Sequence, residues 1–416
     1  MDYRHEIPKR VRVLILGGGI HGVGLLHDLA SRGLKDIFLL EKNSLAQGTS
    51  SRSTKLIHGG LRYLKRASDY SLVSESLRER KLLLDLVPDL VHPLELIFPI
   101  LNKGGEGSLM VKIGLSLYDR LAGKEKVNPH TTVQLEEVLK KTPILNPSEF
   151  KKFYSFWDAQ TDDLALVMRA ANSAVSLGGR ISEHCRAVKV SKSKDGFDVE
   201  VQEEGSEIKK ISALYVVNCL GPWANDFLEK SSIEPAFYGL KNKGVHLILP
   251  DKGLKAGLFL QSPEDRRIFF LLPWLGHTLL GTTESVFDGD PDQVVAQDED
   301  IDYLLSRCNR YLNEPFKKSE IVSSFAGLRW LAMEKSKTIS STSREFSLGE
   351  QASGRGLLIT LYGGKLTSYR SLAEKIGDRI SSHFGEFRPS QTHKQASWIK
   401  AGEHSSPQIL ERFVPG

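Results

Sequence analysis

The sequence predicts an α/β protein of two domains, and three observations point to this fold class. The chain has 416 residues, more than one small hydrophobic core usually organises. Its N-terminal part alternates short apolar runs with a glycine-rich turn and a helical pattern, which is typical of parallel strands connected by helices. Residues 233–350 instead contain short apolar runs separated by turns, which predict a second domain built on an antiparallel sheet.

The composition is that of a globular protein. Apolar residues make up 40% and charged residues 26% of the chain. No apolar run approaches the roughly 18 residues of a spanning helix, and we expect no secretory signal. Three widely spaced cysteines form neither a disulfide framework nor a metal motif, so we expect a reducing compartment and no metal. The net charge of +5 favours anionic substrates or an anionic membrane, and solubility explains it equally well; no nucleic-acid partner is expected.

The first unit has the order strand, glycine turn, helix, strand. Val11–Leu16 is a short apolar run suited to a buried parallel strand, and Val23–Arg32 has the leucine spacing of a helix. Asp36–Leu40 supplies the second strand after Gly33, which is a plausible helix C-cap. The unit therefore has the element order of a dinucleotide-binding fold.

The turn between this strand and helix reads Gly-Gly-Gly-Ile-His-Gly. It fits the G-x-G-x-x-G pattern, with Gly17, Gly19 and Gly22 at the glycine positions. Such glycines allow a tight turn and let a pyrophosphate approach the helix N-terminus, where free N–H groups and the helix dipole favour anions. Glu41 lies about 20 residues beyond the turn, where a carboxylate can bind the hydroxyl pair of a ribose. The motif by itself suits FAD as well as NAD.

The segment after the second strand combines hydroxyls, charges and buriable carbon. Residues 49–64 read Thr-Ser-Ser-Arg-Ser-Thr-Lys-Leu-Ile-His-Gly-Gly-Leu-Arg-Tyr-Leu. This composition suits a binding segment, which needs polar groups and apolar residues that anchor it in the core. A capped helix start with a solvated polar face has the same composition and is the alternative interpretation. Because the glycine turn and Glu41 precede it, we interpret this segment as a cofactor loop.

The later elements follow from periodicity and turn residues. Asp89–Pro99 predicts a crossing into the second domain, because Pro93 and Pro99 interrupt regular structure. Buried strands are predicted at 215–219 and 357–361, each leading into a glycine-containing turn and a helix. Amphipathic helices are predicted at 70–87, 108–121, 164–177, 299–313 and 368–380, and a hairpin at 180–203.

Residues 41–64, EKNSLAQGTSSRSTKLIHGGLRYL, resemble the signature of the FAD-dependent glycerol-3-phosphate dehydrogenases, which are quinone-reducing membrane flavoenzymes. Further segments match this family in the same order along the chain, so the resemblance covers nearly all of it. They are SLVSESLRER at 71–80, KIGLSLYDR at 112–120, VVNCLGPW at 216–223, KGVHLILP at 243–250, RIFFLLPW at 267–274, GTTE at 281–284, AGLR at 326–329 and GGKLTSYR at 363–370.

The resemblance implies a Rossmann-type FAD-binding domain of the glutathione-reductase-like, D-amino-acid-oxidase type and an α+β substrate domain. It assigns residues 8–90, 155–230 and 355–390 to the FAD-binding domain, 91–154 and 231–354 to the substrate domain, and 391–416 to a tail. FAD is expected to bind non-covalently. Its predicted contacts are Gly17, Gly19, Gly22, Glu41, Thr49, Ser50, Ser51, Lys55, Leu56, His58, Gly60, Gly221, Gly364, Lys365, Leu366 and Thr367.

The reaction implied by the resemblance is oxidation of sn-glycerol 3-phosphate to dihydroxyacetone phosphate. It needs cations for the phosphate, a base for the C2 hydroxyl proton, and a flavin about 3–3.5 Å from the C2 hydrogen. Arg329 and Arg344 are the main phosphate candidates, because an arginine can fork onto two phosphate oxygens. Arg62, Tyr63 and Lys365 are predicted beside them. Arg329 has apolar neighbours, so it needs an anionic partner, either the phosphate or a structural carboxylate.

His58 and His246 compete for the role of catalytic base, since a neutral imidazole is suited to accept a proton. With Arg329 they form the predicted catalytic set. His58 lies beside a glycine pair that lets backbone approach a flavin ring, so it is favoured as the flavin neighbour. His246 lies within a predicted strand and is favoured as the proton acceptor; a hydrogen-bonded core histidine is the alternative. The family usually has proline after the arginine at 329, where this chain has Trp330.

The resemblance also implies a membrane quinone as electron acceptor, peripheral contact with an anionic membrane and a cytoplasmic location at its inner face, and it allows a homodimer. The helix at 108–121 is either an interfacial helix or an ordinary core helix. Family members continue with a helical C-terminal domain beyond the point where this sequence stops, so the resemblance implies either a naturally short member or a truncated chain. The alternative functions are an oxidase of the same substrate, a flavoprotein acting on an amino acid or another hydroxy acid, and a non-catalytic FAD-binding protein.

Overall fold

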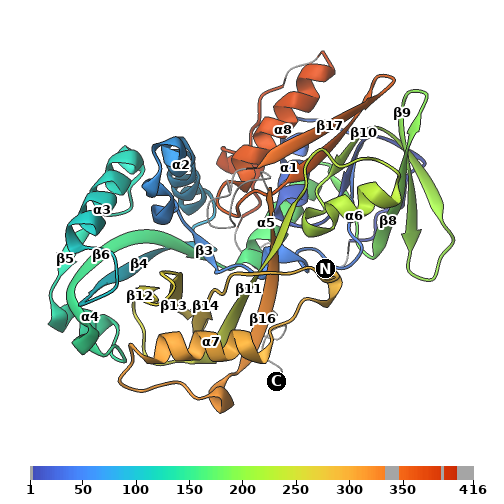
Figure 1. Cartoon of the computed structure of the whole chain (residues 1–416). Helices are drawn as coiled ribbons and strands as arrows, with labels where there is room; N and C mark the ends of the chain where they lie inside the picture. The colour runs from blue at the N-terminus through green and yellow to red at the C-terminus, as the bar shows by residue number, and fades with distance from the viewer. Residues whose placement is uncertain (1–2, 333–345, 386–387, 401–416) are drawn as a thin grey trace.

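The computed structural model describes residues 3–332, 346–385 and 388–400, and it contains two β-sheets with helices packed against them (Figure 1). The first sheet carries the N-terminal strand–helix–strand unit, and the middle of the chain forms most of the second. None of the described helices combines the length and the apolar character that crossing a lipid bilayer requires. Within the described ranges, no group of three or more His, Cys, Asp or Glu residues is placed to hold a metal ion.

The first sheet is mainly parallel. Its strand order is β17-β18-β10-β1-β2-β7, and the hairpin of β8 and β9 continues from the N-terminal half of β10. Neighbours from β18 to β7 run parallel, whereas β17 is antiparallel to β18 at the edge. The strands are β1 (Arg10–Leu16), β2 (Ile37–Leu40), β7 (Arg180–Ser182), β8 (Cys185–Ser193), β9 (Gly196–Glu203), β10 (Lys209–Asn218), β17 (Ser347–Ser353) and β18 (Gly356–Tyr362).

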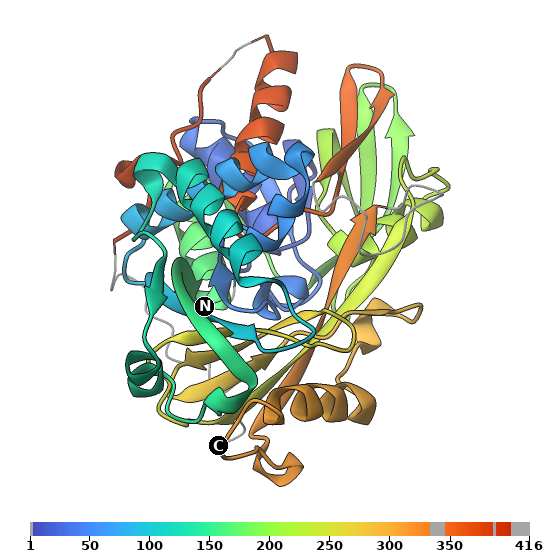
Figure 2. The ribbon, with the colours of Figure 1, turned by 60° about the vertical axis from the view of Figure 1, so that its left-hand side comes forward.

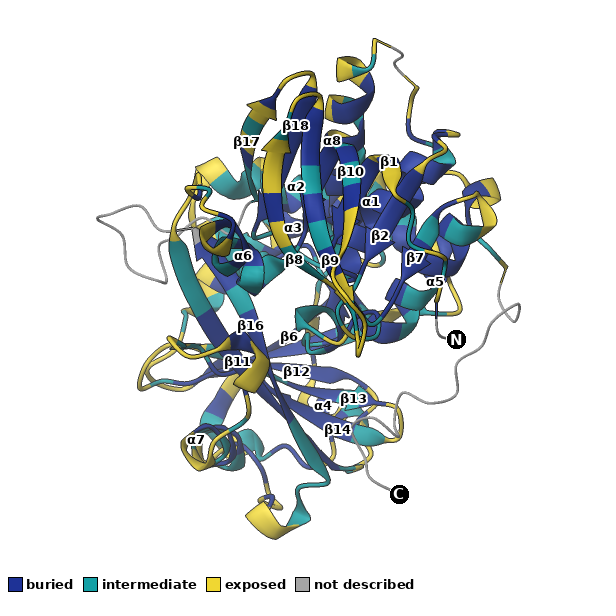
Figure 3. Ribbon diagram, turned by 90° about the vertical axis from the view of Figure 1, so that its right-hand side faces the viewer, coloured by how far each residue is buried: buried dark blue, intermediate teal, exposed yellow. Residues whose placement is uncertain are grey.

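The central parallel strands of this sheet are buried on both faces, whereas β8 and β17 carry exposed residues (Figure 3). Along β1, Val13 and Ile15 join the core under α1, α5 and α8, whereas Leu14 and Leu16 face the opposite layer with Phe227 of α6. This explains the continuous apolar run of the first strand. The helices are α1 (Ile20–Ser31), α2 (Tyr70–Leu86), α3 (Ser108–Ala122), α4 (Leu135–Lys141), α5 (Asp163–Ser176), α6 (Ala224–Lys230), α7 (Asp298–Asn309) and α8 (Tyr369–His383).

The second sheet has the order β15-β11-β14-β13-β12-β4-β6-β3, with β16 beside β11 and β5 beside β6. Its neighbours are antiparallel, except that β12 and β4 run parallel. In Figure 2, α2 and α3 lie next to each other beside β6. The strands are β3 (Leu56–Ile57), β4 (Val91–Leu101), β5 (Thr131–Val133), β6 (Phe150–Thr161), β11 (Gly239–Pro250), β12 (Gly257–Gln261), β13 (Ile268–Trp274), β14 (His277–Gly281), β15 (Ser285–Val286) and β16 (Ser323–Ala332).

The segment predicted as a crossing into the second domain does enter the second sheet, but it forms most of strand β4, so the expectation that Pro93 and Pro99 interrupt regular structure is wrong. β4 pairs with β6 along its whole length, but with β12 only at Leu96 and Ile97. At Pro93 and Pro99 one edge of the strand is therefore unpaired, and the N–H that proline lacks is not required there.

Two predicted domain boundaries fall inside structural elements. The boundary at 155 divides β6, which belongs to the second sheet from end to end. The boundary at 355 divides the hairpin of β17 and β18, which both belong to the first sheet. Only the hydrogen-bonded partner of each strand assigns it to a sheet, and composition does not reveal that partner.

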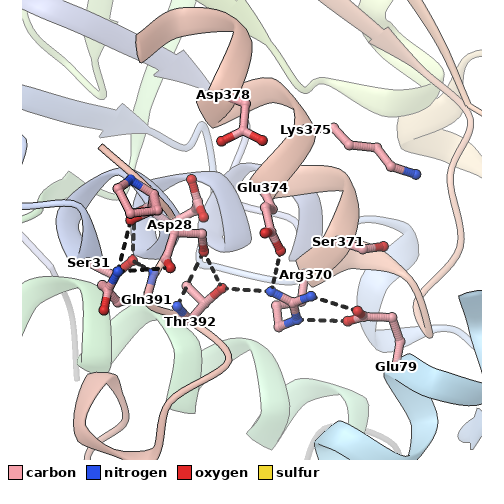
Figure 4. A network of polar contacts seen from close by, with 12 residues as sticks. Asp28, Ser31, Glu79, Arg370, Ser371, Glu374, Lys375, Asp378, Gln391 and Thr392 are labelled. Atoms are coloured by element: carbon pink, nitrogen blue, oxygen red, sulfur yellow. Dashed lines mark hydrogen bonds and ion pairs between the residues drawn. The ribbon is translucent and has the colours of Figure 1, made fainter. Parts of the chain in front are cut away.

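The segment from residue 388 onward, predicted mostly as a tail, is anchored to the first domain over its described part (Figure 4). Arg370 of α8 donates to Thr392 Oγ1 at 3.1 Å, and two of its nitrogens bind both carboxylate oxygens of Glu79 in α2 at 2.6 and 2.8 Å. Trp398 packs edge-on against the ring of His27 in α1, with 4.7 Å between the ring centroids. The segment therefore adds a layer over α1 and α8.

Replacing His27 by Gln should flatten the loss of stability in acid. Burial is the main reason that the pKa of His27 falls from 6.5 to about 4. Between about pH 6.5 and pH 4 the unfolded chain binds a proton that the folded chain does not, so the free energy of unfolding falls by up to about 1.4 kcal/mol per pH unit as pH decreases. Urea unfolding at pH 7.5, 6 and 5 measures this slope. His393→Gln is the control, because His393 is an exposed histidine in the segment from residue 388 onward. This variant should keep the wild-type slope.

Candidate active site

A cavity of about 900 Å³ lies between the two sheets, where β1, β10 and β18 end. Residues 219–223 and 363–367, which follow β10 and β18, line it on one side. His246 of β11 and residues 327–331 of β16 line the other side, and residues 47–54 run between them. Ligands of parallel α/β sheets bind at the carboxyl ends of the strands, so this is the expected place for a cofactor.

The glycine turn is built for close approach of backbone to backbone. A Cβ atom at Gly22 would lie 1.9 Å from the carbonyl oxygen of Gly17, and Gly17 itself has a φ of +104°. Gly19 precedes α1 and lines the cavity, and the amide of Ile20 in the first turn of α1 donates to Ser50 Oγ at 2.8 Å. The turn therefore holds a helix N-terminus, which favours anions, against the hydroxyl-rich segment.

Glu41 ties the glycine turn to the end of β2. Its carboxylate accepts hydrogen bonds from the amide of Gly18 at 2.6 Å and from that of Asn43 at 2.9 Å. Burial raises the pKa of Glu41, while these two bonds act in the opposite direction. Glu41 lines the cavity, and each carboxylate oxygen has a second lone pair for a ligand hydroxyl.

Glu41→Gln should weaken FAD binding by about 10- to 100-fold. The amide has one acceptor oxygen, so at least one backbone bond and one cofactor acceptor are lost, and a bond to a charged group is worth about 1.5–3 kcal/mol. Titrating apoprotein with FAD and following flavin fluorescence measures the dissociation constant. Glu183→Gln is the matched control, because Glu183 accepts from the amides of Tyr3 and Leu45 but does not line the cavity. Equal affinities of the two variants would contradict this role of Glu41.

The predicted hydroxyls at 49–51 lie in the cavity wall, and part of their bonding capacity is used within the protein. Thr49 Oγ1 donates to the carbonyl oxygen of Leu328 at 2.6 Å, which links the segment to β16. Ser50 accepts from α1 as described, and Ser51 is buried. These contacts fix the segment between the two domains.

The structure does not bring Lys55 and Gly60 to the cavity wall. The ammonium of Lys55 lies in the interior, 2.7 Å from Asp163 Oδ1 and 2.6 Å from the carbonyl oxygen of Ser51. A buried ammonium needs such an acid, and Asp163 at the start of α5 provides it. Gly60 has a φ of +85° and would meet the ring of Tyr63 if it had a Cβ atom, so its role lies in the turn.

Three predicted cations gather at one end of the cavity. Arg62 and Arg329 share Glu284, whose Oε1 is 3.4 Å and 3.9 Å from their nearest nitrogens. The ammonium of Lys365 lies 4.1 Å from the ring centroid of Tyr63, and the guanidinium of Arg62 lies 5.5 Å from it. Arg329, Lys365 and Tyr63 line the cavity, and Arg62 stands behind Tyr63. Arg329 retains 36% of its side-chain exposure, which is consistent with its place in the wall.

Both predicted histidines line the same cavity. Burial, and to a smaller extent the cations at 365, 62 and 329, lowers the pKa of His58 to about 3. Burial also lowers the pKa of His246 well below 6.5, with Lys55 and Arg329 as further causes. His246 Nε2 lies 2.9 Å from Thr54 Oγ1, and its ring stacks on Phe325. Both imidazoles are neutral at pH 7, as a proton acceptor must be.

Some site residues were predicted poorly or not at all. Arg344 lies outside the described residues. Glu284 was not predicted, although it stands in the GTTE motif and joins two predicted cations. Arg52 also lines the cavity and donates to the carbonyl oxygen of Ala326 at 3.2 Å. Its place between the hydroxyls of residues 49–54 was the only available signal for that position.

The cavity has the donors that a dinucleotide requires. The Nε1 atom of Trp223 and the Nδ1 atom of His21 are buried without a hydrogen-bond partner in the described part of the protein, and both residues line the cavity. A second glycine pair, Gly363 and Gly364, lies in the loop before α8 with φ values of +76° and +95°. Donors along the wall, an acid at the end of β2 and two helix N-termini fit FAD. The fold and the site thus define the class of FAD-dependent oxidoreductases.

Comparisons with known proteins support this class. A family model described as FAD dependent oxidoreductase matches residues 12–370. D-erythritol 1-phosphate dehydrogenase of Brucella abortus is 34% identical over 389 residues, which are 93% of this chain and 76% of that protein. Glycerol-3-phosphate dehydrogenase of Pseudomonas aeruginosa is 34% identical over 409 residues, 97% of this chain and 78% of that protein. The solved glycerol-3-phosphate dehydrogenase of Bacillus halodurans complexed with FAD has a TM-score of 0.74 at 26% identity, covering 94% of this chain and 69% of that one.

The chain belongs to the family of FAD-dependent glycerol-3-phosphate dehydrogenases. Its α/β fold of the D-amino-acid-oxidase type and its dependence on FAD are those predicted from the sequence.

Proposed function

We propose that this protein oxidises sn-glycerol 3-phosphate to dihydroxyacetone phosphate with FAD as hydride acceptor and passes the electrons to a membrane quinone. The observation that carries the proposal is that Arg329 and Lys365 line one cavity together with two neutral histidines, and that Arg62 joins Arg329 through Glu284. A phosphate dianion balances such a cluster, and an alcohol beside a neutral imidazole can lose its proton.

The cations would hold and orient the phosphate. Arg329 and Lys365 present charge from opposite walls, and Arg62 supports them through Glu284 and Tyr63. Glu284 keeps the two guanidinium groups together when no phosphate is present, at a distance that weakens each ion pair. Arg344, which lies outside the described residues, remains a phosphate candidate from the sequence.

In this proposal His246 accepts the proton of the C2 hydroxyl, and His58 lies beside the flavin. FAD, when bound, would supply the hydride acceptor for this reaction. The stack on Phe325 and the contact with Thr54 fix the plane of the His246 ring, and a Cβ atom at Gly281 would lie 2.2 Å from its Cδ2, so the ring is held from two sides. A fixed imidazole directs proton transfer to one position of the substrate.

FAD would occupy the long part of the cavity. The proposed ligands from the lining are Gly17, Gly19, Glu41, Thr49, Ser50, Ser51, Leu56, His58, Gly221, Gly364, Lys365, Leu366 and Thr367. Gly22 acts behind them by keeping the turn tight.

The outer face of α3 supports peripheral contact with an anionic membrane. Leu109, Met110 and Ile113 are 71%, 63% and 54% exposed, whereas Val111 and Leu115 of the same helix are buried. Lys112 is exposed between them. An apolar face flanked by a cation suits an interfacial helix on anionic lipid. Co-sedimentation with phosphatidylglycerol vesicles, compared with phosphatidylcholine vesicles, tests this contact; equal recovery in both pellets speaks against it.

One cuvette tests the chemistry. Purified protein should be yellow from oxidised FAD, and glycerol 3-phosphate should bleach it under nitrogen by reducing the flavin. A protein that stays yellow after glycerol 3-phosphate is added would contradict the proposal. After bleaching, a soluble quinone should restore the colour faster than oxygen does, whereas the reverse order indicates an oxidase. D-erythritol 1-phosphate should be compared in the same assay, because a relative of equal identity carries its name. If D-erythritol 1-phosphate bleaches the flavin faster than glycerol 3-phosphate does, it is the better substrate, and the proposed roles of the site residues remain the same.

A further inference from the structure

A buried polar cluster lies directly behind the turn that carries His58. Tyr118 of α3 donates to Asp158 Oδ1 of β6 at 2.6 Å, and Arg80 of α2 donates to the same oxygen at 2.7 Å. The amide of Gly59 donates to Tyr118 Oη at 2.8 Å and to Asp158 Oδ1 at 3.2 Å. Three elements of the fold thus converge on one backbone N–H group. The cluster residues do not line the cavity.

The direction of each bond in this cluster is fixed. Burial raises the pKa of Tyr118, so the phenol keeps its proton, and Asp158 takes it as a hydrogen bond. Tyr118 Oη can therefore act toward Gly59 only as an acceptor. Arg80 balances the buried carboxylate and also donates to the carbonyl oxygen of Trp157 at 2.7 Å. A Cβ atom at Gly59 would lie 2.5 Å from both Tyr118 Oη and Leu77 Cδ2, so a residue with a side chain does not fit at this position.

This arrangement determines where the peptide between His58 and Gly59 points. Its N–H is bound to Tyr118 and Asp158, which lie outside the cavity wall. In a planar trans peptide the carbonyl is directed opposite to the N–H, so the carbonyl of His58 points away from the cluster. On its other side, the amide of His58 donates to Thr367 Oγ1 at 3.0 Å, in the loop before α8. His58 is thus fixed by both of its peptides.

We propose that Tyr118, Asp158 and Arg80 are positioning residues, which hold the peptide between His58 and Gly59 so that the carbonyl of His58 remains a hydrogen-bond acceptor on the flavin side. The proposal rests on the proposed function for the placement of the flavin beside His58. A buried ion pair is weak evidence for stability, because apolar residues of similar volume often replace one without loss. The cluster of Tyr118, Asp158 and Arg80 instead converges on the single amide of Gly59 next to the cavity, which indicates that it orients this peptide. A reduced flavin ring has an N–H group that the oxidised ring lacks, so a fixed acceptor stabilises the reduced form.

Tyr118→Phe in the FAD-loaded protein tests the proposal. The variant should bind FAD, show a shifted visible flavin spectrum and a lowered midpoint potential against a reference dye, and reduce about 5- to 10-fold more slowly at saturating substrate, the effect of one hydrogen bond. Tyr311→Phe is the matched control. Tyr311 is equally buried and donates to the carbonyl oxygen of Gln261 at 2.8 Å, in the core of the second sheet. It should lose similar thermal stability and keep the wild-type spectrum and potential.

If Tyr118→Phe does not fold, Asp158→Asn replaces it, because the amide oxygen still accepts from Tyr118 and Arg80 with a weaker bond. Its spectrum and potential should move in the same direction by less. A Tyr118 or Asp158 variant that matches Tyr311→Phe in spectrum, potential and reduction rate would overturn the proposal. Spectrum and potential need no substrate, so they decide this point even when glycerol 3-phosphate fails to bleach the wild type.

Discussion

Replacing His246 by Gln should slow anaerobic reduction of the flavin by glycerol 3-phosphate about 10²- to 10⁴-fold, the usual contribution of a positioned general base. Glutamine has nearly the volume of histidine and can keep the contact with Thr54, so the cavity wall should remain. The amide cannot accept the substrate proton at neutral pH. Stopped-flow absorbance under nitrogen measures the rate directly, and substrate saturation separates the rate from binding.

His58→Gln is the matched variant for this prediction. Both histidines line the cavity and both are neutral at pH 7. The comparison therefore tests which of the two positions, His246 or His58, accepts the substrate proton. The rate of flavin reduction should remain nearly intact in His58→Gln, while its flavin spectrum changes. If the two variants exchange behaviour, His58 is the base and the assignment is reversed.

Arg329→Ala should lower kcat/KM for glycerol 3-phosphate about 10- to 100-fold, mostly through KM. A charge-assisted bond to phosphate contributes about 1.5–3 kcal/mol, and Arg329 is the guanidinium of the cluster that lines the cavity. Glu284 would keep Arg62 as a partner, so the wall should not collapse. Steady-state kinetics with a soluble quinone give both constants.

Unphosphorylated glycerol separates phosphate binding from structural damage. Its low kcat/KM should be the same in Arg329→Ala and in the wild type, because it has no phosphate for the arginine to bind. Arg379→Ala, an exposed arginine of α8 that pairs with Glu350 and does not line the cavity, should leave both substrates unaffected. If glycerol turnover falls as much as glycerol 3-phosphate turnover, Arg329 serves the fold.

Much of the FAD-binding half was predictable because its signals are local. The glycine turn, the helix that follows and Glu41 lie within a short stretch, and each has a physical reason at its own position. The glycines at 17 and 22 must approach each other as backbone, which no other residue permits. The fold class and the cofactor followed from this stretch together with the resemblance of the later motifs.

The predictions that failed depended on distant partners. Pro93 was taken as a breaker, yet it lies in β4 at a position where only one edge of the strand is paired. Lys55 was predicted as a cofactor contact because it lies in the segment 49–64, yet Asp163, 108 positions away, binds its ammonium in the interior. Charge and composition are visible along the chain, but the acid that neutralises a charge is not.

The sequence by itself therefore determined the fold class, the cofactor and the residue types of the site. Only the tertiary structure decided which of these side chains meet. Glu284 joins Arg62 and Arg329 from a strand connection, and Tyr118 reaches Gly59 from a helix 59 positions away. The physical reason is that a strand or turn motif fixes a local backbone shape, whereas an ion pair or a buried hydrogen bond depends on two elements packing together.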